Sequence, residues 1–274
     1  MDNAIDDSTV SCQVQALANG VQSKLKMDRV AIEAPLELRI AGNPATVLMR
    51  TPGDDEELAR GFLFNEGIIR LAEDIESITR PSNLNATEQG NVLDVRLKVT
   101  RKKVDFDRNF YSSSSCGVCG KNSISALAVE GPLCDATLAV TRHVLARLPD
   151  ALRAAQTTFS LTGGVHASGM FTPNGDLLVV REDVGRHNAL DKVIGWALTA
   201  GKLPLSEYLL LISGRVSYEL IQKAVAASIP LVVAVGAPSS LAVELAERFK
   251  ITLIGFLRGS AMNVYTHAHR VTDN

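Results

Sequence analysis

The sequence has 274 residues, of which 46% are hydrophobic and 21% are charged. This composition is typical of a globular protein that buries a sizeable core, and it excludes a disordered chain. The formal net charge of -2 at pH 7 gives the molecule no overall attraction to nucleic acid or to anionic membranes. We therefore expect neither as a partner, and any anion site must be local.

The N-terminal residues begin with an acidic run that contains Asp2, Asp6 and Asp7. The first 26 residues contain no sustained apolar stretch of the kind that a signal peptide or a membrane span requires. We expect a cytoplasmic protein in which residues 1–30 form a mobile arm.

Residues 31–108 are expected to form a small β-rich domain. Apolar runs at 31–40 and 45–49 flank a Gly-Asn-Pro breaker and predict two antiparallel strands. Asp54 is placed to cap a helix that ends near Asn65, and strict alternation of apolar and charged residues at 93–99 predicts a half-buried strand.

Residues 109–122 form a serine-rich segment without periodicity, which predicts a mobile loop. It contains Cys116 and Cys119, the only two of the four cysteines that lie close together, and this usage suits a reduced compartment with one reactive thiol site. Cys12 and Cys134 are interpreted as bystanders.

The two cysteines leave several chemistries open: half a zinc site, a dithiol redox centre, a persulfide carrier, or no function. Zinc needs further ligands, and only His267 and His269 lie close together elsewhere, without finger-like spacing. A thioredoxin-type pair usually lies at a strand-to-helix junction rather than after a serine-rich loop. An exposed loop with Lys121 nearby favours a reactive thiolate, although the spacing does not give the order of the two cysteines.

Residues 123–274 are expected to form an α/β domain that binds a cofactor. Helical patterns occur at 137–147 and 150–159, followed by a hairpin with strands at 168–172 and 177–181. Helices and short apolar strands then alternate, with helices at 188–198, 217–227 and 239–249 and strands at 208–212, 231–235 and 251–256. This order predicts a mainly parallel or mixed sheet in a three-layer α/β/α arrangement.

Ligands of such sheets bind beyond the carboxyl ends of the strands, where this chain has three polar loops. The candidate residues there are Ser213, Gly214, Arg215, Gly236, Ser239, Leu257, Arg258, Gly259 and Ser260. Glycines admit an anion to the backbone, a serine can open a helix, and arginine can hold phosphate oxygens in two contacts. The alternative is that these segments are ordinary turns of an α/β domain.

A further cluster of charge runs from Arg181 to Lys192 and includes His187, which we count among the candidate cofactor-binding residues. Polar residues concentrated where a strand meets a helix are typical of a site in α/β proteins. A solvated turn with a helix cap is the alternative for His187. The roles of His166, His187 and Asp183 stay open.

Several of these segments closely resemble the FdhD family of formate dehydrogenase accessory sulfurtransferases over residues 31–270. The segments are Ser115-Cys116-Gly117-Val118-Cys119-Gly120, Thr162-Gly163-Gly164-Val165-His166, Arg181-Glu182-Asp183-Val184-Gly185-Arg186-His187-Asn188-Ala189-Leu190-Asp191-Lys192, Ser213-Gly214-Arg215 and Asn263-Val264-Tyr265-Thr266-His267. The resemblance implies that Cys116 accepts sulfur from a cysteine desulfurase as a persulfide, with Cys119 as its partner. It also implies delivery to the molybdenum bis-molybdopterin guanine dinucleotide cofactor of formate dehydrogenase.

The same resemblance places the cofactor, as a bound substrate, at Phe256, Leu257, Arg258, Gly259, Ser260 and Ala261. GDP or GMP should then act as mimics, no permanently bound metal is expected, and the partners are the desulfurase, the catalytic subunit of formate dehydrogenase and a second copy in a homodimer. Family members often carry another basic residue after the glycine, whereas Ser260, Ala261 and Met262 follow here. One phosphate contact must therefore be missing or come from elsewhere.

The family's larger domain is similar to the cytidine deaminase fold, which raises the alternative of a zinc deaminase. That chemistry needs a histidine or cysteine two positions before a glutamate, and a proline before the Cys-x-x-Cys. No histidine or cysteine in this sequence has a glutamate two positions later, and Ser115 rather than proline precedes Cys116. The remaining alternative is a chaperone that binds the molybdenum cofactor without transferring sulfur.

Overall fold

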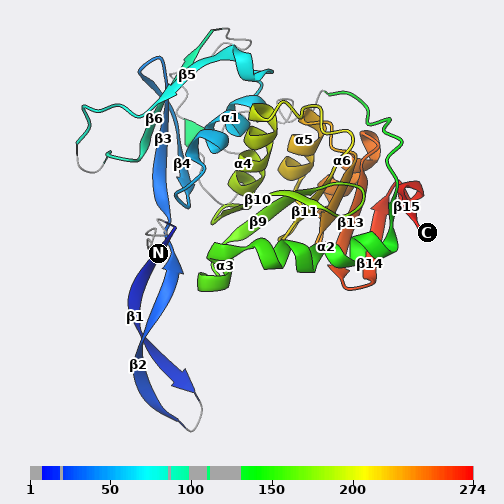
Figure 1. Ribbon diagram of the computed structural model, residues 1–274, viewed down its shortest axis with the longest axis horizontal. Coiled ribbons are helices and arrows are strands. Elements are labelled where there is room, and N and C mark those ends of the chain that lie inside the picture. Colours follow the sequence, from blue (N-terminus) through cyan, green and yellow to red (C-terminus); the bar gives the residue numbers. More distant parts are fainter. Residues whose placement is uncertain (1–7, 19–20, 86–87, 99–109, 112–130, 274) are drawn as a thin grey trace.

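The computed structural model describes residues 8–18, 21–85, 88–98, 110–111 and 131–273. Figure 1 shows a long two-stranded hairpin, a small sheet domain beside it and a larger α/β domain. Cys116 and Cys119, and with them nearly all of the loop expected at 109–122, lie outside the described residues. No helix in the described ranges is long and apolar enough to cross a bilayer.

The N-terminal hairpin pairs β1 (Thr9–Ala18) with β2 (Val21–Ala31) in antiparallel register, and it projects away from the rest of the molecule (Figure 1). We expected a mobile arm here and assigned it no regular structure. The alternation of Val10, Cys12 and Val14 with polar residues is the signal of a strand in this segment.

The small domain is a five-stranded sheet in the order β5-β6-β3-β4-β7, covered by helix α1 (Asp55–Asn65). Its strands are β3 (Ala34–Ile40), β4 (Asn43–Arg50), β5 (Ile75–Thr79), β6 (Val92–Leu97) and β7 (Phe110–Tyr111), with a 3-10 turn η1 (Ala72–Asp74) before β5. The predicted antiparallel pair, helix and strand are confirmed. Asp54 is the N-cap residue but makes no side-chain capping bond, because it adopts the left-handed conformation, with φ of 54°.

The large domain contains a six-stranded mixed sheet in the order β10-β9-β11-β12-β13-β14. The strands are β9 (His166–Phe171), β10 (Leu177–Asp183), β11 (Leu209–Ile212), β12 (Leu231–Ala234), β13 (Thr252–Arg258) and β14 (Ala261–Thr266). Strands β11, β12 and β13 are parallel, and β9 and β14 flank them in antiparallel pairs. A short parallel pair joins β8 (Val140–Thr141) to β15 (Val271–Thr272), which follows the 3-10 turn η3 (Ala268–Arg270).

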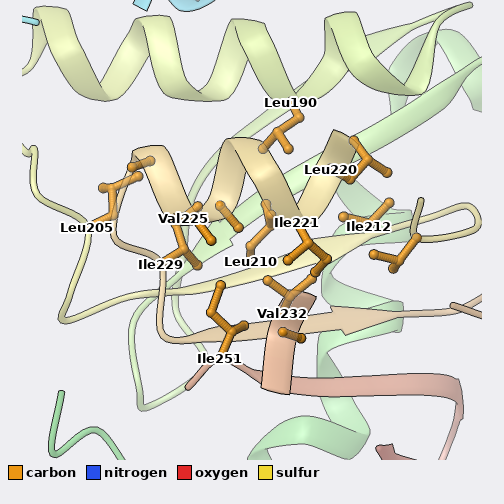
Figure 2. Close-up of a cluster of buried hydrophobic side chains, with 14 of the residues drawn as sticks. Leu190, Leu205, Leu210, Ile212, Leu220, Ile221, Val225, Ile229, Val232 and Ile251 are labelled. Atoms are coloured by element: carbon orange, nitrogen blue, oxygen red, sulfur yellow. The ribbon is translucent and has the colours of Figure 1, made fainter. Parts of the chain in front are cut away.

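Helices cover both faces of this sheet, so the expected three-layer α/β/α arrangement is confirmed. Helices α4 (Arg186–Thr199), α5 (Tyr218–Ala226) and α6 (Ser240–Arg248) pack on one face, where Figure 2 shows Leu190 and Ile221 against Leu210 and Val232. Helix α2 (Arg142–Ala155) covers the other face, and the short α3 (Thr157–Thr162) follows it. The similarity to the cytidine deaminase fold stays a prediction.

Two elements of this domain differ from expectation. The helices predicted at 137–147 and 150–159 are a single helix α2 that runs through Pro149, followed by the short α3. Leu145, Leu148 and Leu152 are buried along one side of α2, and this packing holds the helix together on both sides of the proline. Strand β14 was not predicted, because as an edge strand it is only partly buried.

The two domains meet where α1 crosses α4. Gly61 of α1 lies against the backbone of Asp191, and Gly195 of α4 lies against the backbone of Glu57. A Cβ atom at either glycine would overlap a carbonyl oxygen of the other helix. Glycine at both positions therefore allows the helix backbones to touch and fixes the small domain on the large one.

Candidate functional site

The three loops that follow β11, β12 and β13 lie together at one edge of the sheet, as predicted. Val216 forms an isolated parallel bridge with Pro238, and the backbone N–H of Gly236 donates to the carbonyl oxygen of Gly214 over 3.3 Å. The N–H of Phe256 in turn donates to the carbonyl oxygen of Gly236 over 3.1 Å. The loops are thus hydrogen-bonded to one another in a continuous layer.

The close packing of these loops requires glycine at position 236. A Cβ at Gly236 would lie 2.7 Å from the carbonyl oxygen of Gly214, and one at Gly255 would lie 2.9 Å from Cδ of Pro238. Such distances are shorter than van der Waals contact, so the loops could not stack with larger residues. Gly236, which we predicted to admit a ligand, therefore has a structural role that does not depend on one.

The 256–261 segment is the tip of the β13–β14 hairpin. Arg258 pairs with Ala261 across a turn in which Gly259 has φ of +55°, and Phe256 and Arg258 are exposed beside exposed Ser260. Leu257, which we predicted to contact the cofactor, is completely buried in the core beneath the hairpin. Its side chain cannot reach a ligand, because a register shift between Gly255 and Arg258, where Phe256 has φ of 55°, turns it toward α2 while Phe256 and Arg258 are exposed.

Two of the three candidate serines, Ser213 and Ser239, are already engaged. Ser239 caps α6, because its Oγ accepts a hydrogen bond from the N–H of Ala242 over 3.3 Å. Oγ of Ser213 accepts from the N–H of Ala167 over 2.9 Å and fastens its loop to β9. Arg215, by contrast, is exposed and, like Arg258, makes no ion pair within the described residues, so both guanidinium groups are available to an anion.

His187 lies in the first turn of α4 and reaches the start of α5. Its Nε2 lies 3.2 Å from Oγ of Ser217 and 3.8 Å from a carboxylate oxygen of Glu219. Burial lowers the pKa of His187 to about 4, and the nearby charges of Lys223 and Arg186 act in the same direction. The imidazole is therefore neutral at physiological pH.

His166 opens β9 on the opposite side of the same loop. Its Nδ1 lies where a Cβ at Gly214 would be only 3.1 Å away. Burial lowers the pKa of His166 as well, and the guanidinium groups of Arg186 and Arg215 lower it further. Two neutral imidazoles and two arginines thus gather around the loop after β11.

The charged segment from Arg181 to Lys192 has mainly structural contacts in the part of the molecule described. Arg181 donates from Nε and from one terminal nitrogen to the carboxylate of Glu57, over 2.5 and 2.8 Å. Glu182 accepts from the N–H groups of Thr158 and Phe159 over 2.8 and 2.9 Å, which stabilises the start of α3. Each residue holds a neighbouring element in place.

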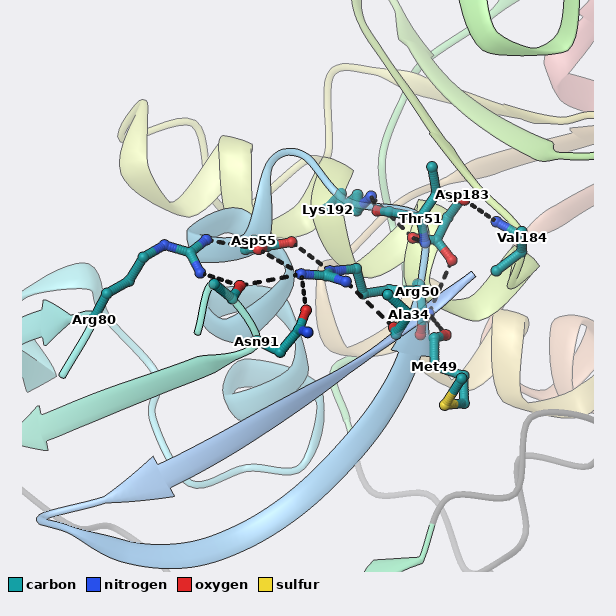
Figure 3. Close-up of polar contacts among 12 residues, drawn as sticks. Ala34, Met49, Arg50, Thr51, Asp55, Arg80, Asn91, Asp183, Val184 and Lys192 are labelled. Atoms are coloured by element: carbon teal, nitrogen blue, oxygen red, sulfur yellow. Dashed lines mark hydrogen bonds and ion pairs between the residues drawn. The ribbon is translucent and has the colours of Figure 1, made fainter. Parts of the chain in front are cut away.

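Asp183 and Lys192 extend this role to the joint between the domains (Figure 3). Their side chains form a buried ion pair of 2.9 Å, the carboxylate accepts from the N–H of Thr51, and the ammonium donates to the carbonyl oxygen of Thr51. Asn188 donates to both Asp183 and the carbonyl oxygen of Met49. The segment that we interpreted as a site is thus, in large part, what fastens α4 to strand β4.

A second network, within the small domain, centres on Arg50, which no sequence signal had singled out. Its guanidinium donates twice to the buried carboxylate of Asp55, over 2.8 and 3.1 Å, and Arg80 reaches the same carboxylate over 2.7 Å (Figure 3). A charged residue inside an alternating strand is ordinarily expected to face solvent, so sequence alone could not identify this one as buried.

A third polar contact ties α4 to α5 one turn beyond His187. Asp191 is buried, and its carboxylate accepts from Lys223 over 2.6 Å and from Asn65 of α1 over 2.6 Å. Burial raises the pKa of Asp191, while Lys223 opposes the shift. His187 and Asp191 on α4 thus face Glu219 and Lys223 on α5, and this pairing sets the position of the His187 ring.

The site therefore belongs to an α/β protein with two exposed arginines at its strand-end edge, and its large domain is fixed to a small sheet domain by the Arg181–Glu57 ion pair and by the hydrogen bonds of Asp183 and Lys192 to Thr51. The chain belongs to the FdhD/NarQ family, whose model matches residues 31–272. It is 50% identical over 256 residues to the sulfur carrier protein FdhD of Mycolicibacterium paratuberculosis, covering 91% of this chain and 94% of that protein. It is 42% identical to the sulfur carrier protein FdhD of Saccharolobus solfataricus over 248 residues, which are 89% and 91% of the two chains.

A solved structure supports the same relationship. A crystal structure from Desulfotalea psychrophila, described as a formate dehydrogenase accessory protein, superposes with a TM-score of 0.79 and 25% sequence identity. The match covers 97% of this chain and all of that one. The similarity to this structure thus extends over both domains.

Proposed function

We propose that this protein is a sulfurtransferase that receives sulfur from a cysteine desulfurase as a persulfide on Cys116 and passes it to the molybdenum bis-molybdopterin guanine dinucleotide cofactor of formate dehydrogenase. Its membership of a family whose curated members are named sulfur carrier proteins carries the proposal. The two exposed arginines at the strand-end edge support the cofactor half of it.

Every step of the proposed sulfur transfer is an exchange between a thiolate and an S–S bond, so thiols and persulfides are the only reactants needed. The Cys116 thiolate attacks the outer sulfur of the desulfurase persulfide, a new S–S bond forms on Cys116, and the desulfurase cysteine leaves as a thiolate. The Cys119 thiolate then attacks the inner sulfur, which forms a Cys116–Cys119 disulfide and releases the outer sulfur as sulfide to the cofactor. A cellular dithiol reductant restores the two thiols.

The described flanks of the cysteine segment agree with delivery between domains. Before it, β7 pairs with β4 in the small domain, and after it, Gly131 packs against Val225 of α5 in the large domain. The chain that carries Cys116 and Cys119 therefore joins one domain to the other.

The nucleotide ends of the substrate are assigned to the strand-end edge, with Arg215 and Arg258 as the phosphate ligands and GDP or GMP as mimics. Both guanidinium groups are exposed and free of ion pairs in the described structure, so binding breaks no existing contact. No resident metal is part of the proposal.

We also propose a homodimer. Large apolar side chains are exposed on the β1–β2 hairpin, among them Leu17 at 77%, Leu25 at 69% and Met27 at 64% exposure. An isolated two-stranded hairpin is marginally stable in water, so a second copy that covers these side chains would stabilise it.

The client that receives the sulfurated cofactor is the catalytic subunit of formate dehydrogenase.

Mass spectrometry of the intact protein tests the sulfur step. After incubation with a cysteine desulfurase and cysteine, the wild type should gain the mass of one sulfur atom, removable by a thiol reductant, and Cys116→Ala should gain none. Cys12→Ala is the matched control and should behave as the wild type. Absence of the adduct from every variant would favour the alternative, a chaperone that binds the cofactor without transferring sulfur.

A further inference from the structure

We infer that two copies of this chain join through their N-terminal hairpins, with strand β1 of one copy lying antiparallel beside β1 of the other in a continuous four-stranded sheet. The pairing is centred on Gln13, which lies opposite Gln13 of the second copy. The inference rests on the homodimer of the proposed function and adds the edge and the register through which the two copies meet.

Strand β1 has an outer edge to which a further strand can be added. In the described part of the chain, β1 and β2 form a sheet of two strands, and the hairpin projects away from both domains (Figure 1). The N–H of Ile32 donates to the carbonyl oxygen of Ser8 over 2.8 Å, so these two residues form a hydrogen-bonded pair of the ladder. Because such pairs alternate along antiparallel strands, the backbone groups of Ser11 and Gln13 point away from β2, and both residues are exposed.

The two edges of the hairpin differ in charge. No charged residue and no proline occurs among the ten residues of β1, whereas β2 carries Lys24, Lys26, Asp28 and Arg29. Natural edge strands use charged side chains, lysine above all, to prevent pairing with another chain. The edge of β2 is therefore protected and that of β1 is not, which makes β1 the edge that accepts another strand.

The sequence of β1 is complementary to a second copy of itself. Antiparallel pairing about Gln13 places Val10 opposite Ala16 of the second copy and Cys12 opposite Val14, so the apolar face continues across the contact. The other side chains between residues 10 and 16 are polar, and they meet polar side chains of the second copy. A two-fold interface requires this self-complementarity, so the pattern favours a second copy over an unrelated strand.

The same register covers the exposed tip of the hairpin. It brings Leu17 of the second copy to the base of the first hairpin, where Oγ of Ser8 lies 3.0 Å from Oγ1 of Thr158 in α3. Leu161 follows Thr158 by three residues and lies on the same side of that helix. Leu17 and Leu161 are 77% and 43% exposed, and their contact removes apolar surface of both copies from water.

Cysteine cross-linking of the full chain tests the register. In a background with Cys12, Cys116 and Cys119 replaced by alanine, Gln13→Cys should form a disulfide between two copies under mild oxidation. Opposed residues of such a pair have Cα atoms about 5.5 Å apart, within the range of a disulfide. Met27→Cys is the matched control, because Met27 faces Gln13 across the hairpin and is 64% exposed, yet lies on the outer strand, about 14 Å from its counterpart.

Sedimentation equilibrium measures the strength of the contact. Gln13→Pro removes an N–H that points away from β2, so the hairpin keeps its own ladder while two hydrogen bonds between the copies are lost. The dissociation constant of the dimer should rise by about tenfold or more. Met27→Pro removes the equivalent outward N–H of β2 and should leave the dissociation constant unchanged.

Each outcome decides the inference. Cross-links of equal strength through Gln13→Cys and Met27→Cys would show that the copies meet through a face of the hairpin and would overturn it. A dimer without a cross-link through Gln13→Cys, or a chain that stays monomeric, would overturn it as well. A cross-link to the catalytic subunit of formate dehydrogenase in place of the dimer would assign the edge to the client. Persulfide formation is measured on chains that retain Cys116, so the pairing and the sulfur transfer can fail separately.

Discussion

Lys192 and Asp183 face each other over 2.9 Å with 1% and 0% of their side chains exposed, and both hold the backbone of Thr51 in the other domain. An ion pair buried to this degree gives little net stability compared with apolar residues of the same size, yet breaking it leaves a buried charge without a partner. The pair therefore specifies how β4 sits against α4.

Replacing Lys192 with Met should destabilise the protein by about 3–5 kcal/mol, because the carboxylate of Asp183 remains buried and unpaired. Urea unfolding followed by circular dichroism measures this difference in the free energy of unfolding. Lys250→Met is the control, since Lys250 pairs with Asp135 at the surface and surface pairs contribute at most about 1 kcal/mol. Equal effects of the two substitutions would show that the buried pair has no special role.

Replacing Gly195 with Ala should separate the helices that join the domains. The new methyl group would overlap the carbonyl oxygen of Glu57, and overpacking of this kind costs about 1–3 kcal/mol or more. Thermal unfolding of the variant should therefore begin at a lower temperature. Gly164→Ala is the control, because its Cβ would meet no atom closer than 3.7 Å, and a comparable loss there would contradict the explanation.

The pKa of His187 makes stability depend on pH. Above pH 6.5 the imidazole is neutral in both states, whereas below it the unfolded chain binds a proton that the folded protein does not accept until about pH 4. Stability should therefore fall as pH drops from 6.5 toward 4, by roughly 2–3 kcal/mol from this residue. The groups that face the ring are Arg186 on α4, His166 on β9, and Glu219 and Lys223 on α5.

Urea unfolding between pH 4 and pH 7 checks this dependence. His187→Gln should flatten the profile, and His143→Gln at an exposed position should leave it unchanged. A residual slope should remain in His187→Gln, because burial lowers the pKa of His166 too. A profile identical to that of the wild type would mean that His187 is not held neutral by the fold.

Replacing Arg258 with Ala should weaken GDP binding by about 1.5–3 kcal/mol, the usual contribution of a charge-assisted contact. Arg258 is exposed at the hairpin tip, so the substitution should not affect the fold. Titration calorimetry measures the affinity, with Arg142→Ala as the control. An unchanged dissociation constant would move the nucleotide site away from the hairpin.

Local patterns made much of this architecture predictable. The alternating helices and apolar strands after residue 186 have clear periods, and the edge rule for parallel strands correctly placed the loops after β11, β12 and β13 at one edge of the sheet. The small-domain strands and α1 followed from the same kind of pattern. The hairpin at 9–31 was not assigned, although Val10, Cys12 and Val14 alternate with polar residues.

The sequence could not show which residues pair with one another in the folded protein. Arg181, Asp183 and Lys192 read as a dense polar site, but their partners are Glu57 and Thr51, more than a hundred positions away along the chain. Leu257 is buried and Arg258 exposed because β13 changes register between Gly255 and Arg258, and the sequence of the segment gives no sign of this irregularity. Such pairings depend on tertiary contacts that no local pattern contains.

Transfer of sulfur from Cys116 to the cofactor is the central claim, and an isotope label tests it most directly. The protein is loaded by a cysteine desulfurase with a heavy sulfur isotope, mixed with formate dehydrogenase whose cofactor lacks sulfur, and the extracted cofactor is weighed by mass spectrometry. The heavy isotope should appear in the cofactor with the wild type and with Cys12→Ala, but not with Cys116→Ala. An unlabelled cofactor with the loaded wild type, or a labelled one with Cys116→Ala, would contradict the account.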